Sequence, residues 1–468
     1  MLGLLLGLVI TILVGYLIVK KHKTQFALQF VLLCGGIILM CFAVLFGLGE
    51  ILPEHKSTNW IALDIFAIIK NSFTTRALDF GLMIMAVGAF ARYMDKIGAS
   101  EALVNITAKP LNALKAPYVV LAFAYIIGQV LNIFIPNAAG LSLLLMLTIF
   151  PILINLGVSR EGAAALIATT ACLDLGPASG NAILAAKAAD INIAEYFVSY
   201  QLKLAIITML VISISHFFVQ KWFDKKQALQ SSNNMNDEVV LDNKVDTPVQ
   251  QSRPVSNLYI LLPLLPLILI LTFGKLVISG IKMNVTIATI ISLLVAILFE
   301  LFRKRDLKQV VTEMKVFFDG MGKQFATVVT LIVASEMFGR GLIAVGVKDT
   351  LISNVQLFGF GIFLTTLIMV FIITLSAIVM GSGLVSFFAF LQSVPNIAAI
   401  EFGISPVLMI LPLQLVTGIA RSMSPITTVI IVISSIANIS PLDLIKRTML
   451  PMTFALITVF LGTFIFYH

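Results

Sequence analysis

The chain has 468 residues, of which 59% are hydrophobic and 12% are charged, and its mean hydropathy is +1.05. Soluble domains carry roughly 25% charged residues, so this composition excludes a soluble globular fold and predicts an all-α polytopic membrane protein. The net charge of +8 is mainly a signal of membrane topology, and a nucleic-acid partner is excluded.

The first apolar run, residues 2–19, predicts a membrane span and not a cleaved signal peptide. No basic residue precedes this run, and no small-residue cleavage site follows it before Lys20, Lys21 and Lys23. Basic loops stay on the cytoplasmic side, so these lysines place the N-terminus on the periplasmic side of a bacterial inner membrane.

Two interruptions stand out in the first half of the chain, residues 1–220. The sequence IPNAAG breaks the apolar run 118–156 and favours a re-entrant hairpin with its tip near residue 137. The sequence GPASGN starts at Gly176 and predicts a broken helix over 161–190. The other expected elements are spans at 26–48, 78–94 and 197–219 and an amphipathic surface stretch at 99–117.

A polar segment, residues 221–257, is rich in Ser, Asn, Asp and Gln and predicts a flexible cytoplasmic linker. Residues 258–468 then repeat the order of the first half. They contain a second hairpin, with its tip near 382 in the sequence MGSG, and a second broken helix over 405–438. The other expected elements are spans at 258–279, 284–302 and 325–345, a basic amphipathic stretch at 303–324 and a closing span.

The two halves also match locally. GPASGNAILAAKAADI at 176–191 aligns without gaps with SPITTVIIVISSIANI at 424–439, which pairs Pro177 with Pro425. An odd number of crossings in each half would give the halves opposite orientations. The sequence therefore predicts two inverted repeats, with about ten transmembrane helices, two of them broken, two re-entrant hairpins and a periplasmic C-terminus.

A broken helix is unfavourable in a membrane, because its backbone N–H and C=O groups lose their hydrogen-bond partners where no water can replace them. Such breaks persist where they line a cavity and meet a ligand. The N-terminus of a half-helix carries free N–H donors and a partial positive charge, which favour carboxylates. Two hairpin tips and two breaks thus predict one anion site near the midplane.

Charged residues inside the apolar runs have a separate significance, since a charge near the bilayer centre costs about 2.5–3.5 kcal/mol. Arg421 precedes the second break and could bind a substrate carboxylate through two hydrogen bonds, or it could form a structural ion pair with Asp174. Asp174 could alternatively bind a coupling cation, sodium or a proton. Glu336 and Arg340 stand four residues apart, which predicts a local pair on one helix.

An enzyme is disfavoured by the reactive residues that the chain contains. The four histidines lie near span ends or in loops, without a serine or glutamate partner in a catalytic pattern. Cys34, Cys41 and Cys172 lie in apolar segments and have neither disulfide nor metal spacing, so they are interpreted as small core residues. No cofactor and no metal are expected.

Several stretches together carry a resemblance to a known family. They are LMIMAVGAFARYMDKIGAS, APYVVLAFAYIIGQ, GLSLLLMLTIFPILINLGVSR, ISHFFVQKWFDKK, FFDGMGKQFATVVTLIVASEMF, AIVMGSG, ARSMSPIT and SPLDLIKRT. Over nearly its whole length the chain resembles the anaerobic four-carbon dicarboxylate transporters of the DcuC type, and more closely the DcuD-like branch. The resemblance implies the ion-transporter superfamily architecture and the exchange or efflux of succinate, fumarate, malate or aspartate.

The resemblance also implies the substrate site. Its residues would be Asn137, Gly140, Gly176, Pro177, Ser179 and Asn181 from the first half, and Gly381, Ser382, Gly383, Ser422, Ser424, Pro425 and Thr427 from the second, beside Arg421. Related superfamily members are dimers, so the amphipathic stretches could brace a homodimer.

The chain departs from the family at both hairpin tips. Family members tend to carry hydroxyl residues where this chain has Pro136 and Asn137, and the second tip continues with Leu384 where the family often has Asn-Ala-Pro. Another small organic anion, such as a monocarboxylate, citrate or an amino acid, therefore stays open as the substrate. A passive anion channel is the more remote alternative.

Overall fold

The computed structural model describes residues 25–47, 57–233, 257–273, 283–346, 361–381 and 403–467, with the isolated positions 9, 10, 13 and 387. Their secondary structure is helical, and the described residues form no strand. Six helices in this part of the chain are long and apolar enough to cross a membrane, namely Pro117–Phe134, Ala138–Asn155, Ile193–Leu229, Val285–Lys304, Leu307–Ala344 and Pro441–Tyr467. The protein is therefore an all-helical membrane protein, as the composition predicts.

The described part of the first half begins with α2 and ends with α11, which at 32 residues is the longest α-helix among the described elements. Its elements are α2 (Gln25–Leu45), α3 (Ile61–Arg76), the π-helix η2 (Ala77–Gly81), α4 (Leu82–Ile97), α5 (Ala99–Ala108), η3 (Lys109–Ala113), α6 (Pro117–Phe134), α7 (Ala138–Asn155), α8 (Arg160–Thr169), α9 (Gly180–Ala188), α10 (Ile193–Glu195), the π-helix η4 (Tyr196–Gln201) and α11 (Leu202–Asn233).

The second half is described from Asn257 to Tyr467, with gaps at 274–282, 347–360 and 382–402 apart from residue 387. Its described elements are η5 (Asn257–Ile260), α12 (Leu261–Phe273), α13 (Val285–Lys304), α14 (Leu307–Gln324), the π-helix η6 (Phe325–Val329), α15 (Thr330–Ala344), α17 (Ile362–Met380), α20 (Val407–Arg421), α21 (Thr428–Ala437) and α22 (Pro441–Tyr467).

The helix that ends at Ile97 begins earlier than the expected span at 78–94, because α3, η2 and α4 run on without a break from Ile61. Charged residues lower the hydropathy of α3 and hid it in the sequence. Two of them have partners in the fold. Asp64 accepts hydrogen bonds from Ser57 and Thr58 just before the helix, and Arg76 forms an ion pair with Glu336.

The predicted start of the linker at 221 is wrong, because α11 continues to Asn233. Lys, Gln, Ala and Leu in this stretch are good helix formers, so the helix continues into its polar end. The rest of the linker lies outside the described residues. So do most of the first predicted span at 2–19, the two chain ends, and Ser382 and Gly383 of the second hairpin tip.

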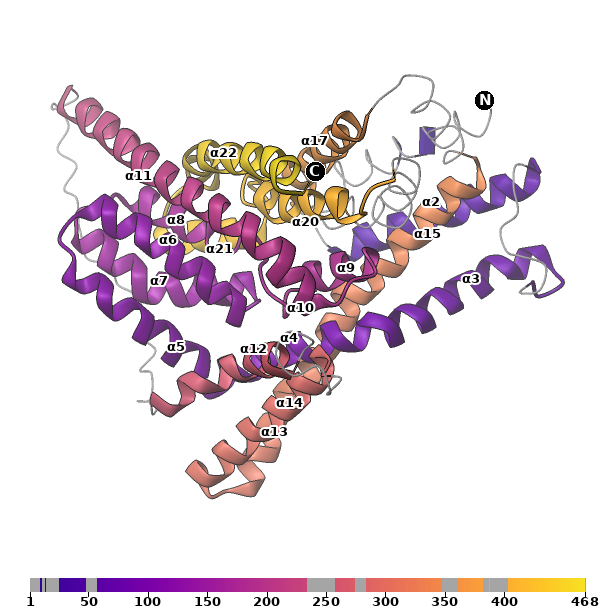
Figure 1. The fold of residues 1–468 in the computed structure, drawn as a ribbon, viewed down its shortest axis with the longest axis horizontal. Coiled ribbons are helices and arrows are strands. Elements are labelled where there is room, and N and C mark those ends of the chain that lie inside the picture. Colours follow the sequence, from indigo (N-terminus) through magenta and orange to yellow (C-terminus); the bar gives the residue numbers. More distant parts are fainter. Residues whose placement is uncertain are drawn as a thin grey trace.

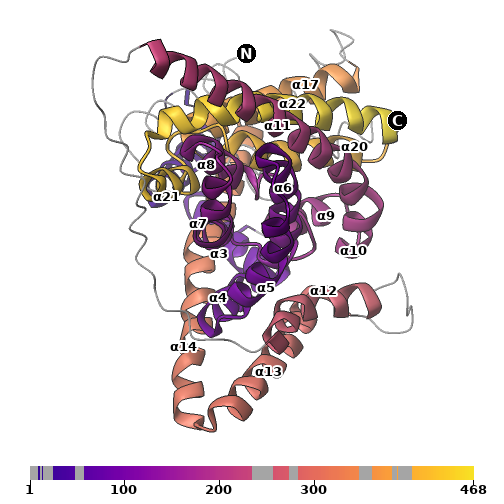
Figure 2. The same cartoon turned by 90° about the vertical axis from the view of Figure 1, so that its left-hand side faces the viewer.

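The helices fall into two groups by the hydrophobic cores that hold most of their buried residues, and a small core of Val87, Ala194, Ile270, Val285 and Ala288 joins the two groups. The largest core joins α6–α9 and α11 of the first half to α17 and α20–α22 of the second, and we refer to these helices as the core body. Two smaller cores lie between α2, α3 and α15 and among α4, α12, α13 and α14, and we refer to these helices as the scaffold. Figures 1 and 2 show α13 and α14 projecting beyond the core body, while α11, α20 and α22 lie together along its far side.

Two long helices of the scaffold pack side by side in opposite directions. One is α3–η2–α4 and the other is α14–η6–α15, which crosses the molecule diagonally in Figure 1. The α4 part packs on α14 and the α3 part packs on α15. Each helix has a π turn near its middle, and the two turns meet where a Cβ at Gly81 would lie 3.3 Å from Cγ2 of Val329.

Helices α2 and α15 approach so closely that glycine is needed at their contact. A Cβ on Gly36 would lie 2.5 Å from the carbonyl carbon of Met337, and a Cβ on Gly341 would lie 2.8 Å from the carbonyl oxygen of Gly36. Both distances are far below van der Waals contact, so any side chain there would push the helices apart.

We therefore expect Gly36→Ala to destabilise the scaffold by about 1–3 kcal/mol through overpacking. The matched control is Gly339→Ala on α15, where a Cβ would have no heavy atom within 4 Å. Thermal unfolding followed by size-exclusion chromatography should give a midpoint several degrees lower for the first variant than for the second. Equal midpoints would contradict the close contact.

Candidate functional site

The first broken helix unwinds over ten residues, 170–179, between α8 and α9. Asp174 and Gly176 in this segment have left-handed backbone angles, with φ of 47° and 94°. Glycine is required at position 176 for a second reason, since a Cβ there would lie 2.8 Å from Cγ2 of Ile133. Ser179 then starts α9 as its N-cap, where its hydroxyl accepts a hydrogen bond from the backbone N–H of Ala182 at 3.4 Å.

The second broken helix unwinds over the six residues 422–427, between α20 and α21. The Thr427 hydroxyl donates to the carbonyl oxygen of Arg421 at 2.9 Å, and the Thr448 hydroxyl donates to that of Ser422 at 2.9 Å. In the alignment of the two breaks Ser422 corresponds to Asp174, whose carbonyl oxygen accepts from Gln201 at 3.3 Å. A residue of η4, just before α11, and a residue of α22 thus supply a donor to the same position of the two breaks.

The two breaks meet, because one face of α20 lies along the unwound segment of the first half. Three residues on that face, spaced by about one helical turn, are Gln414, Gly418 and Arg421. Arg421 Nη2 donates to the carbonyl oxygen of Ala171 at 3.0 Å, and Gln414 Nε2 donates to that of Leu173 at 3.4 Å. A Cβ on Gly418 would collide with the carbonyl oxygen of Cys172 and lie 2.9 Å from Oδ2 of Asp174.

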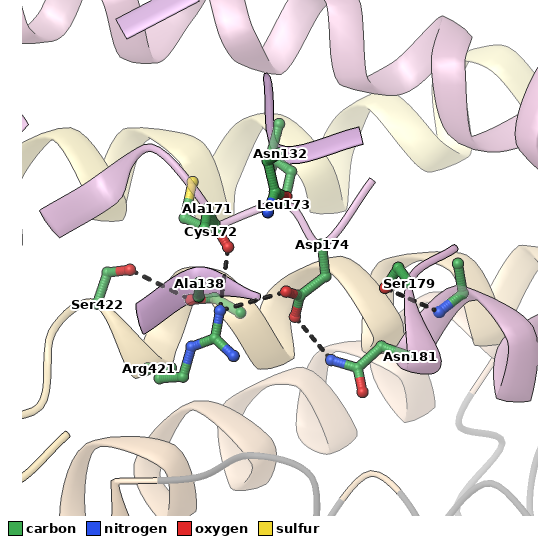
Figure 3. Close-up of polar contacts among 12 residues, drawn as sticks. Asn132, Ala138, Ala171, Cys172, Leu173, Asp174, Ser179, Asn181, Arg421 and Ser422 are labelled. Atoms are coloured by element: carbon green, nitrogen blue, oxygen red, sulfur yellow. Dashed lines mark hydrogen bonds and ion pairs between the residues drawn. The ribbon is translucent and has the colours of Figure 1, made fainter. Parts of the chain in front are cut away.

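A charged group lies at this junction (Figure 3). Arg421 Nη2 is 3.2 Å from Oδ1 of Asp174, and Asn181 Nδ2 donates to Oδ2 of the same carboxylate at 2.6 Å. The side chains of Arg421 and Asp174 are 23% and 12% exposed. The structure therefore contains the ion pair that was one of the two interpretations of Arg421, and Asn181 holds the carboxylate from the other side.

A small cavity lies beside Arg421. Arg421, Ser422 and Thr427 of the second break line it together with Ala171 of the first break and Ala138 at the start of α7. The first hairpin tip and both breaks therefore converge here. The volume is about 10 Å³, which has room for about one water molecule and is too small for a four-carbon acid.

The predicted first hairpin tip lies in the turn between α6 and α7. Asn137 is the N-cap of α7, where its side chain accepts a hydrogen bond from the backbone N–H of Gly140 at 3.3 Å. A Cβ on Gly140 would lie 2.9 Å from this asparagine and 3.3 Å from Oδ2 of Asp95 on α4. Asn137 is therefore occupied in a structural contact, close to but not among the residues that line the cavity beside Arg421.

The other predicted residues lie at different places around the junction. Pro177 faces a separate apolar cavity of about 20 Å³, next to Pro136 and helices α12 and α13. Gly381 has φ of 71° and lies against Ile426, so the visible end of the second hairpin touches the second break beside Pro425. The Ser424 hydroxyl is fully buried and has no hydrogen-bond partner among the described residues.

Sequence reasoning missed the buried glutamines. Gln201 and Gln414 are both 0% exposed and contact each other across the two halves, with Nε2 of Gln201 donating to Oε1 of Gln414 at 3.0 Å. Their position inside apolar runs was a signal that the sequence did contain. A buried carboxamide needs a hydrogen-bond partner, so each glutamine should have one. The partner itself lies more than 200 residues away in the sequence.

Two ion-pair groups outside the junction are also informative. The predicted pair of Glu336 and Arg340 is confirmed at 3.0 Å, and Arg76 of the first half joins it at 2.6 Å. Arg447 on α22 pairs with Asp224 on α11, and Asp224 also accepts hydrogen bonds from the hydroxyl groups of Ser159 and Tyr118. These groups join helices of the two halves. Among the described residues, no group of three or more His, Cys, Asp or Glu could hold a metal ion.

Comparison with known proteins gives a consistent family. The model of the family described as "C4-dicarboxylate anaerobic carrier" (DcuC) matches residues 2–468. The anaerobic C4-dicarboxylate transporter DcuC of Escherichia coli K12 is 32% identical over 462 residues, which cover 98% of this chain and 96% of that protein. The probable anaerobic C4-dicarboxylate transporter DcuC of Vibrio cholerae is 31% identical and covers 99% of this chain and 98% of its own.

Solved structures share the fold at low sequence identity. MtrF of Neisseria gonorrhoeae, described as one of a class of antimetabolite efflux pumps, has a TM-score of 0.59 at 11% identity, covering 97% of both chains. The YdaH transporter of Alcanivorax borkumensis has a TM-score of 0.52 at 14% identity, covering 93% of this chain and 97% of its own. At these identities the likeness concerns the fold alone.

We expect Asp174→Asn to lower the stability of the protein, because Arg421 then loses its carboxylate. Loss of one partner in a fully buried pair costs about 3–5 kcal/mol, and this pair is partly exposed, so about 1–3 kcal/mol is expected. Asp443→Asn is the matched control, since Asp443 pairs with Lys446 at 2.7 Å but both side chains are more than half exposed. Unfolding midpoints measure the difference, and a control as unstable as Asp174→Asn would argue against the pair.

Proposed function

The chain belongs to the DcuC family of anaerobic C4-dicarboxylate carriers, and on this premise we propose that it carries succinate, fumarate, malate or aspartate across the bacterial inner membrane by exchange or efflux. The family consists of carriers, so the protein is not an enzyme. The proposal needs a site for a small dianion within the membrane-spanning part of the chain. The observation that carries it is Arg421, a cation at the meeting point of the two broken helices.

Arg421 suits a carboxylate for reasons of geometry and charge. A guanidinium group is planar and presents parallel N–H donors that match the two oxygens of a carboxylate. In the present arrangement its Nη2 is used by Asp174 and by the carbonyl oxygen of Ala171. We propose that a substrate carboxylate takes the place of Asp174 as the partner of Arg421, with the hydroxyl groups of Ser422 and Thr427 beside it.

The second carboxylate of the substrate would lie near the start of a half-helix. Helices α9 and α21 both begin at a break and turn their free N–H groups and positive dipole ends toward it. Ser179 and Thr427 are the N-cap residues of these two helices. One carboxylate on the cation and one at a half-helix N-terminus would account for a four-carbon dianion. The proposal also includes the remaining predicted residues of the hairpin tips and breaks. They are Asn137, Gly140, Gly176, Pro177, Asn181, Gly381, Ser382, Gly383, Ser424 and Pro425.

A cavity of about 10 Å³ cannot hold such a substrate, so transport requires the site to open. We propose alternating access, in which the core body and the scaffold change their relative position. Two inverted repeats would support such a motion. The evidence for them is the similar element order of the halves, the opposed π-helix pair of the scaffold, and the matching side-chain contacts to Asp174 and Ser422.

A different small organic anion is the second candidate. Five of the eight residues that line the cavity are apolar, and the tip residue Asn137 is used as a helix cap. If the site has too few polar groups to bind two carboxylates, it would favour a monocarboxylate. A passive channel is the remote alternative, and saturation and stimulation from the far side distinguish it from a carrier.

We expect purified protein in proteoliposomes to take up labelled succinate faster when the vesicles contain unlabelled succinate, fumarate or aspartate than when they are empty. Vesicles loaded with lactate should not stimulate uptake. Parallel measurements with and without sodium identify a coupling cation. Stimulation by lactate alone would replace the dicarboxylate by a monocarboxylate, and uptake that neither saturates nor responds to internal substrate would indicate a channel.

We expect Arg421→Lys to raise the KM for succinate at least tenfold, because lysine keeps the charge but loses the planar arrangement of donors. Arg340→Lys is the matched control, since Arg340 pairs with Glu336 in the scaffold and is 45% exposed. The control should leave the KM within about twofold of the original protein. An unchanged KM in a folded Arg421→Lys variant would remove Arg421 from the site.

A further inference from the structure

We propose that Gln201 and Gln414 are positioning residues, which hold the unwound segment 171–176 in the shape that turns Asp174 toward Arg421. This role rests on the proposed function, because the shape of the segment matters for transport only if Arg421 and Asp174 belong to the substrate site. The contacts themselves are independent of the substrate. Neither glutamine lines the small cavity beside Arg421, so both would act through the segment and not by touching the substrate.

Gln414 supplies donors to the segment from the second half. Its Nε2 lies 3.4 Å from the carbonyl oxygen of Leu173 and 3.5 Å from that of Asp174. Its Oε1 accepts hydrogen bonds from Nε2 of Gln201 at 3.0 Å and from the Tyr196 hydroxyl at 3.4 Å. Both ends of the carboxamide are therefore engaged, which fixes its orientation.

Gln201 supplies both a donor and an acceptor from the first half. Its Nε2 donates to the carbonyl oxygen of Asp174 at 3.3 Å, and its Oε1 accepts from the backbone N–H of Gly176 at 3.1 Å. The two glutamines thus bind the peptide groups on either side of the turn formed by Asp174 and Gly176. Both side chains are 0% exposed, so water has no access to replace these contacts.

The backbone explains why such support is needed. Asp174 has φ of 47°, a left-handed region that is uncommon for residues with a side chain, although aspartate adopts it more readily than most. The segment has left the helix, so the carbonyl groups of residues 171–174 lack the usual backbone donors, while that of Gly176 accepts from the N–H of Ser179. A carboxamide is neutral and carries, on separate atoms, a donor for a carbonyl group and an acceptor for an N–H. Methionine has a similar length and shape but offers no N–H donor.

The experiment uses Cys172, which lies in the segment and is 0% exposed. With Cys34→Ala and Cys41→Ala, this thiol becomes the single cysteine of the chain. Its rate of reaction with N-ethylmaleimide in detergent, without substrate, reports how often the segment opens. We expect Gln201→Met and Gln414→Met each to raise this rate at least tenfold.

The matched control is Gln29→Met in the scaffold. Gln29 is 8% exposed, and its Nε2 donates to the carbonyl oxygens of Ala326 and Thr327 at 3.2 and 3.0 Å, so the substitution removes similar contacts elsewhere. We expect this variant to leave the Cys172 rate within about twofold. Unchanged rates in Gln201→Met and Gln414→Met would overturn the proposal, and so would an equal increase in Gln29→Met, which would indicate general loosening.

Transport kinetics provide a second measurement on the same variants. Asp174 is the internal partner that the substrate carboxylate replaces on Arg421, so displacing it should lower the KM for succinate at least fivefold in Gln414→Met while the maximal rate stays within about twofold. Gln29→Met should change neither value by that amount. If the original protein does not transport succinate, the dicarboxylate proposal fails while the labelling rates still decide the role of the glutamines. Faster labelling with an unchanged KM would overturn the link between the segment and the site.

Discussion

The constraint on which the rest of the structure depends is that an unwound backbone in an apolar interior must find hydrogen-bond partners. The first break exposes the carbonyl groups of residues 171–174, and the other half of the chain satisfies most of them through Gln414 and Arg421. Gly418 lies between these two residues and lets the helix come close enough. The need to satisfy one interrupted helix therefore joins the two halves.

These contacts between the first break and α20 explain why helices of both halves form a single core body. The largest hydrophobic core combines helices from both halves, while α2–α4 and α13–α15 pack mainly on each other. The breaks are not satisfied in the same way. The second break uses its own hydroxyl groups and Thr448, whereas the first uses side chains of both halves. The first break is thus the one whose shape depends on the association of the halves.

The parts of this arrangement that follow local rules could be predicted from the sequence. Gly176, Pro177 and Pro425 mark the breaks because glycine and proline interrupt helices, and the tip at Asn137 follows from the same rule. Helix α3 could not be predicted from hydropathy, since its charged residues are paired only in three dimensions. The contacts of Gln201 and Gln414 were equally hidden, because sequence spacing has no information about partners in the other half.

The sequence left open whether Arg421 binds a substrate carboxylate or pairs with Asp174. The ion pair is compatible with both roles. A guanidinium group in a partly buried position needs a carboxylate, and Asp174 supplies one while the cavity beside Arg421 is too small for substrate. A substrate carboxylate offers the same charge and the same two oxygens, so it could replace Asp174 without leaving the cation unpaired. Asn181 would still hold the displaced aspartate through its side chain. An internal carboxylate of this kind would let the site close when empty, which net efflux requires for the return step, whereas strict exchange and a channel do not.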